Sequence, residues 1–151
     1  MKTETEENLI LELRRSFPVT RERLYNAWTD PAEVRHWFGP EGLSVLDVQM
    51  DLRVGGSYLI KVKGCEGAGT MTAVGEFREV TPPSKVEYTW RVDGDTDWDG
   101  LESIVTVEFH EKAGGSELCL THRGFPSEES RNRHEQGWSG TLEKLARRVQ
   151  A

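Results

Sequence analysis

Apolar side chains recur at every second position through much of the chain, which is the spacing of a β-strand with one buried face. The pattern is clearest over residues 85–92, where Val86, Tyr88, Trp90 and Val92 alternate with polar or charged neighbours. Such stretches, punctuated by glycine, proline and aspartate, predict antiparallel strands over residues 9–17, 44–52, 57–63, 70–80, 85–92, 103–111 and 117–123.

Helical signals stand in three places between and after these strands. Thr20 predicts the N-cap of a short helix, and Asp30 followed by Pro31 predicts the start of a second one that ends near Trp37. Ser127 predicts the N-cap of a long final helix with glutamates in its first turn and arginines in its last. The apolar stripe of this final helix consists of Trp138, Leu142, Leu145 and Val149.

The order of these elements is one strand, two short helices, six strands and one long helix, which indicates an α+β fold. A long amphipathic helix packs economically with such a sheet when the sheet curls around it. The concave face then leaves space of the kind in which ligands bind. We expect a polar tail over residues 1–8 and a single domain over residues 9–151, because 151 residues is a usual size for one domain.

Charge and composition narrow the range of functions. The chain carries 26 acidic and 19 basic residues, a net charge of −7, which argues against generic nucleic-acid binding and against adhesion to anionic membranes. No apolar run is long enough to span a bilayer and the N-terminus does not resemble a signal peptide, so we expect a cytoplasmic protein. Cys65 and Cys119 fit neither a metal-binding pair nor a disulfide framework, and we expect both to be reduced.

The chain holds five tryptophans, a large number for its length. Trp28 belongs to a helix stripe and is expected in the core, whereas Trp90 and Trp138 lie on inner faces and are expected to line a cavity. Trp37 and Trp98 are candidates for the cavity mouth or for contact with a partner protein. Core packing stays the alternative for all five.

Several segments resemble, in their order, a known superfamily. They are residues 36–42, 51–56, 75–83, 88–90, 122–125 and 134–138, followed by Leu142 and Leu145. The superfamily has the helix-grip fold and includes START lipid-transfer domains, the birch pollen allergen and polyketide cyclases. More narrowly, the chain resembles the family named after the C-terminal domain of the activator of heat shock protein 90 ATPase. The resemblance covers residues 9–149 and implies a curved antiparallel sheet wrapped around the C-terminal helix.

The theme of this superfamily is the binding of apolar small molecules. The resemblance therefore implies a protein that holds an apolar, amphipathic or lipid-like molecule between the final helix and the sheet, and we expect it to need no cofactor and to be a binding protein more than an enzyme. Alternation, side-chain chemistry and the resemblance together select the lining candidates Met50, Tyr58, Met71, Trp90, Phe109, Leu120, His122 and Trp138. Both a monomer and a homodimer remain open.

The family name implies a second candidate function, a co-chaperone that stimulates heat shock protein 90. The eukaryotic co-chaperone carries an additional N-terminal domain, and we expect no room for one in 151 residues. This departure from the family pattern makes heat shock protein 90 the weaker candidate partner.

His122 and His134 are candidates for a third function, a cyclase-like or hydrolase-like enzyme with a cavity histidine as base. His122 shares a strand face with Leu118 and Leu120, which is expected to be the inner face. His134 precedes Trp138 by one helical turn, so the two are expected to point the same way. No nucleophile or carboxylate stands at a spacing that completes a triad, and catalysis is therefore the weaker expectation.

Two further features have both a structural and a functional interpretation. Gly137 and Gly140 each cost a helix about 1 kcal/mol relative to alanine, so the helix is expected to pass close to another group. A strand or the loop at residues 38–40 is the favoured neighbour, and a ligand is the alternative.

Residues 95–100 match the opening of a calcium loop, but position twelve is Thr106 instead of glutamate. A solvated acidic hairpin tip is favoured there, and no metal is expected.

Overall fold

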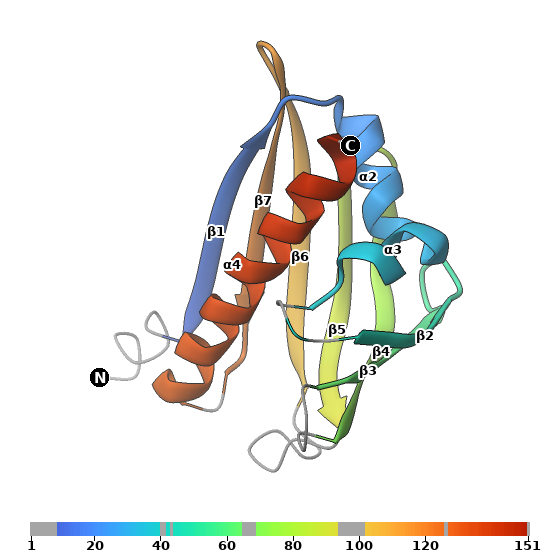
Figure 1. The fold of residues 1–151 in the computed structure, drawn as a ribbon, viewed down its shortest axis with the longest axis vertical. Coiled ribbons are helices and arrows are strands. Elements are labelled where there is room, and N and C mark those ends of the chain that lie inside the picture. The colour runs from blue at the N-terminus through green and yellow to red at the C-terminus, as the bar shows by residue number, and fades with distance from the viewer. Residues whose placement is uncertain are drawn as a thin grey trace.

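The computed structural model describes residues 9–39, 42, 44–64, 69–93, 102–125 and 127–150. Its elements are β1 (Ile10–Phe17), α2 (Arg21–Thr29), α3 (Pro31–Trp37), β2 (Ser44–Met50), β3 (Ser57–Lys63), β4 (Thr70–Thr81), β5 (Lys85–Asp93), β6 (Ser103–Lys112), β7 (Gly115–Arg123) and α4 (Glu128–Gln150). The strands form one antiparallel sheet in the order β1-β7-β6-β5-β4-β3-β2, which confirms the predicted α+β architecture (Figure 1). The predicted tail, the acidic tip at residues 95–100, Cys65 and Trp98 lie outside the described residues.

Helices α2, α3 and α4 lie on one side of the curved sheet (Figure 1). Helix α4 packs against β1, α2 and α3, while α2 packs against β6 and β7, and α3 packs against β2. Thr20, Asp30 and Ser127 each accept a backbone N–H from the first turn of the helix they precede, at 3.2, 2.9 and 3.1 Å, which confirms the three predicted N-caps. No helix in the described part of the chain is long and apolar enough to cross a membrane.

Two tryptophans pack at the centre of the core beneath the short helices. The ring centroids of Trp28 and Trp37 are 4.6 Å apart, and Trp37 donates its N–H to the carbonyl oxygen of Ala27 at 2.8 Å. Trp37 is only 1% exposed, so it cannot meet a partner protein at the surface. Of the interpretations given above, core packing is therefore correct for Trp37 as well as for Trp28.

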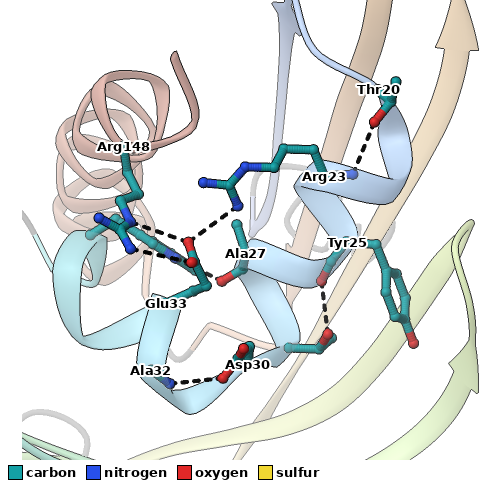
Figure 2. A network of polar contacts seen from close by, with 10 residues as sticks. Thr20, Arg23, Tyr25, Ala27, Asp30, Ala32, Glu33 and Arg148 are labelled. Atoms are coloured by element: carbon teal, nitrogen blue, oxygen red, sulfur yellow. Dashed lines mark hydrogen bonds and ion pairs between the residues drawn. The ribbon is translucent and has the colours of Figure 1, made fainter. Parts of the chain in front are cut away.

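The carboxylate of Glu33 joins the three helices (Figure 2). It accepts one hydrogen bond from Arg23 of α2 at 3.2 Å and two from Arg148 of α4, both at 3.2 Å. The two bonds from Arg148, together with the one from Arg23, outweigh the effect of burial and lower the pKa of Glu33 from its usual value. This network fixes α3, whose C-terminal end carries Trp37 and Phe38, against α4.

A buried chain of hydrogen bonds fastens α4 to the sheet. The indole N–H of Trp138 donates to Nδ1 of His122 at 3.1 Å, and Nε2 of His122 lies 2.8 Å from Oγ of Ser103. Because an indole nitrogen can only donate, Nδ1 accepts, and the neutral imidazole carries its proton on Nε2 and donates it to Ser103. Ser103 in turn donates to the carbonyl oxygen of Trp90 at 3.3 Å, so the chain runs from α4 through β7 and β6 to β5.

We expect Glu33→Gln to lower the free energy of unfolding by about 1 kcal/mol, since it removes the charge from hydrogen bonds that join three helices. The estimate is kept low because Arg23 and Arg148 are 34% and 35% exposed. Urea denaturation at neutral pH measures the change. Glu143→Gln is the matched control, because its ion pair with Arg15 is a surface contact and should contribute less than about 0.5 kcal/mol. Equal losses for the two variants would contradict the role given to Glu33.

We expect the free energy of unfolding to fall as the pH drops below about 6.5, the usual pKa of histidine. Burial, and secondly the charge of His134, hold the pKa of His122 well below that value, so the unfolded chain binds a proton that the folded chain does not. One such group adds a slope of up to about 1.4 kcal/mol per pH unit. Urea denaturation across this range should give a flatter dependence for His122→Leu, and parallel curves for the two proteins would overturn the prediction.

Candidate functional site

A pocket of about 230 Å³ lies between α4 and the inner face of β3, β4 and β5. We call it the outer pocket, and its lining residues are Phe38, Gly39, Ile60, Val62, Met71, Ala73, Trp90, Val92, Arg133, His134, Gly137, Trp138 and Thr141. The side chains that the sheet contributes are aliphatic or aromatic. The charged and hydroxyl-bearing side chains, Arg133, His134 and Thr141, all come from α4.

Two small residues explain why space remains here. Ile60, Ala73 and Val92 are register neighbours on three adjacent strands, and all three line the pocket. Ala73, in the middle, contributes only a methyl group, so the surface of the sheet is recessed at this position and leaves open volume. On the α4 side of the pocket, a β-carbon placed on Gly137 would meet no atom within 4 Å. The expectation that a strand or loop approaches the helix closely is therefore wrong for Gly137, which faces open space.

Trp90 and Trp138 form the aromatic wall together with Phe38, and the two indole rings have centroids 5.4 Å apart. The N–H of Trp138 is bonded to His122, as described above. The N–H of Trp90 is buried and has no hydrogen-bond partner among the described residues. An unpaired buried donor costs about 1–3 kcal/mol, so within the described part of the chain Trp90 holds a buried N–H whose hydrogen-bonding capacity is unused.

A much smaller hollow of about 20 Å³, the inner hollow, adjoins the outer pocket. Phe38, Ile60 and Trp90 line both spaces and so form the partition between them. The other residues around the inner hollow are Trp28, Val34, Trp37, Met50, Tyr58, Phe77 and Tyr88. Its volume has room for about one water molecule, in contrast to the outer pocket.

The structure distributes the predicted lining residues over three places. Met71, Trp90 and Trp138 line the outer pocket, while Met50 and Tyr58 line the inner hollow. The three remaining candidates, Phe109, Leu120 and His122, are buried in the core and line neither space. They lie on β6 and β7, against which α2 packs directly, so the inner face of this half of the sheet is filled by protein.

The two candidate bases have different surroundings. His134 lines the outer pocket and places Nδ1 3.0 Å from the carbonyl oxygen of Ser130. His122 has no exposure and uses both ring nitrogens within the protein, and its ring centroid lies 5.4 Å from that of His134. The described residues contain no group of three metal-ligating side chains.

The Ser103–His122 pair has the spacing of a nucleophile and a general base, but the direction of the hydrogen bond is the opposite of what catalysis requires. Nε2 of His122 already carries a proton and donates it to Ser103, so the imidazole cannot accept the serine proton in this arrangement. Ser103 is also 2% exposed and absent from the pocket lining. The pair is suited to anchoring Trp138.

The sequence contained signals for several residues that were not selected. Val62, Ala73 and Val92 share inward faces with selected neighbours, and alternation alone places them beside the pocket. Ser103 continues the inward series of β6, so its hydroxyl could have been recognised as buried. Arg133 and Thr141 had no such signal, since their position depends on the path of α4 across the sheet.

The comparisons with known proteins agree with this architecture. The family model described as "Activator of Hsp90 ATPase homolog 1-like protein" matches residues 18–150. The AHSA1 protein from Silicibacter pomeroyi has a solved structure with a TM-score of 0.80 and 36% identity, covering 93% of this chain and 96% of that one. A protein of known structure from Chromobacterium violaceum gives a TM-score of 0.87 at 26% identity, covering 95% and 98% of the two chains.

A shorter match relates the chain to "Activator of 90 kDa heat shock protein ATPase homolog 1" of Mus musculus, at 38% identity over 66 residues. The matched segment is 42% of this chain and 18% of the mouse protein, so most of that relative has no counterpart in the match. The family model, in contrast, covers nearly the whole described chain, and the solved relatives share its fold from end to end. The chain therefore belongs to the Activator of Hsp90 ATPase homolog 1-like family, within the helix-grip superfamily.

Proposed function

We propose that this protein is a cytoplasmic binder of a compact apolar or amphipathic small molecule, which it holds in the outer pocket. The observation that carries the proposal is an open volume of about 230 Å³ against an aliphatic and aromatic floor. An apolar cavity of about 150 Å³ is enough to bind benzene, so the outer pocket suits a ligand somewhat larger than one ring.

The distribution of polar groups supports an amphipathic ligand. Arg133, His134 and Thr141 stand on the α4 side, and Arg133 and His134 are at least partly exposed. A ligand can therefore bury its apolar part against the sheet and keep a polar part near α4. Binding is favoured over catalysis because the buried His122 is hydrogen-bonded at both ring nitrogens.

Gly137 supports the same function. Its position in the middle of α4 lowers helix stability by about 1 kcal/mol relative to alanine, and no atom of the described residues lies within 4 Å of a β-carbon placed there. A binding site explains the glycine, because any larger side chain at this position would occupy part of the pocket.

We expect Gly137→Leu to weaken the binding of 2-naphthol, a two-ring probe, by at least about tenfold, because the new side chain fills the outer pocket. The variant should remain folded, since leucine is a better helix former than glycine. Tryptophan fluorescence titration measures the affinity, because Trp90 and Trp138 line the pocket.

Ser139→Leu is the matched control, since it adds the same side chain to an exposed position of α4 two residues away. It should bind 2-naphthol as the wild-type protein does. If Gly137→Leu binds as tightly as this control, or if a broad panel of apolar probes leaves the wild-type fluorescence unchanged, the proposed function is wrong.

A second candidate function is stimulation of the heat shock protein 90 ATPase. The observation that favours it is the 38% identity over 66 residues to the mouse activator. It ranks second because that match covers only 18% of the mouse protein.

The two candidates are separated by an ATPase assay with heat shock protein 90 from the same organism. If the protein is only a ligand binder, we expect the ATP turnover rate to stay within experimental error at saturating concentrations of this protein. A several-fold increase in that rate would support the co-chaperone function instead. Bovine serum albumin at the same concentration controls for nonspecific stabilisation of the ATPase.

A further inference from the structure

The polar side chains around the outer pocket differ in whether the protein satisfies them. Trp138 donates its N–H to His122, and the hydroxyl of Thr141 donates to the carbonyl oxygen of Gly137 at 2.8 Å. His134 places Nδ1 beside the carbonyl oxygen of Ser130. Trp90 is different, because its N–H has no hydrogen-bond partner among the described residues although the side chain is only 7% exposed.

The surroundings of Trp90 explain why the protein does not supply a partner. Its ring packs among other rings, with centroids at 6.1 Å to Phe38, 5.8 Å to His122 and 5.4 Å to Trp138. Aromatic neighbours give an indole ring good packing but offer it few oxygen acceptors. Trp90 is also part of the partition, so it borders both the outer pocket and the inner hollow.

We propose that the ligand of the outer pocket carries a carbonyl-type oxygen that accepts a hydrogen bond from the indole N–H of Trp90, a buried donor that turns toward the pocket when the ligand binds. An indole nitrogen can only donate, so the complementary ligand atom is an acceptor. Buried polar groups in proteins are nearly always paired, and a missing partner beside a pocket points to one supplied by a bound molecule. The ligand class is thus a one- or two-ring apolar compound with a ketone, ester or carboxyl oxygen. This inference rests on the proposed function, since it concerns the ligand of the same pocket.

The test compares 1-indanone with indane, two probes of nearly equal shape that differ in one carbonyl oxygen. Isothermal titration calorimetry gives the dissociation constant of each probe for the wild-type protein and for Trp90→Phe. Phenylalanine keeps an aromatic ring but has no N–H. We expect the affinity for 1-indanone relative to indane to fall at least about fivefold in Trp90→Phe, because the buried carbonyl oxygen loses its donor.

Trp138→Phe is the matched control, since the same substitution in the same pocket removes an N–H that His122 already uses. This variant should weaken both probes alike and leave their affinity ratio at the wild-type value. A fall in the ratio equal to that in Trp90→Phe would overturn the assignment of the donor to Trp90.

A second measurement does not depend on the variants binding well. In a ¹H–¹⁵N spectrum the five tryptophans give indole N–H signals, and the signal of Trp90 is assigned by its loss in Trp90→Phe. It should move to lower field when 1-indanone is added and much less with indane. If both probes bind but neither the affinity ratio nor this signal responds to the carbonyl, the inference about Trp90 is wrong and the proposed function stands. If neither probe binds the wild-type protein, the proposed function falls with it.

Discussion

The hydrogen bond that Trp138 donates to the buried His122 ties the middle of α4 to the sheet, and the shape of the candidate site follows from this attachment. Because His122 in turn donates a hydrogen bond to Ser103, and Ser103 donates one to the carbonyl oxygen of Trp90, this chain of polar groups links the helix to three neighbouring strands. Glu33 acts near the other end of α4, where Arg148 and Arg23 hold α3 in place. Held in this way, α4 leaves the space in front of β3, β4 and β5 open, and the outer pocket is the result.

Most of the fold could be predicted because it rests on local signals. Alternation located every strand to within about two residues, and Thr20, Asp30 and Ser127 marked the starts of the helices correctly. The differences are at strand ends. The strand expected over residues 44–52 ends at Met50, because Asp51 donates its backbone N–H to Ser57 and the chain turns there.

The candidate site could be predicted less well, because it depends on which part of the sheet the helices cover. Alternation shows that Phe109 and Leu120 face inward, but not that helix α2 fills the space in front of them. Likewise, the sequence indicates that Gly137 is unusual in a helix, while only the packing of α4 shows that the space beside it is empty. Whether a side chain faces inward depends on the local sequence, whereas whether it lines a pocket depends on the packing of the whole tertiary structure.

The partition formed by Phe38, Ile60 and Trp90 has a consequence for how binding preference can diverge among proteins of this fold. The same three residues border both spaces. The open volume therefore depends on three side chains that make no hydrogen bond in the framework described above. A smaller residue at position 38 would therefore leave more open volume next to both spaces. In this fold, the size of the ligand that fits can therefore change through single substitutions while the strands and helices keep their positions.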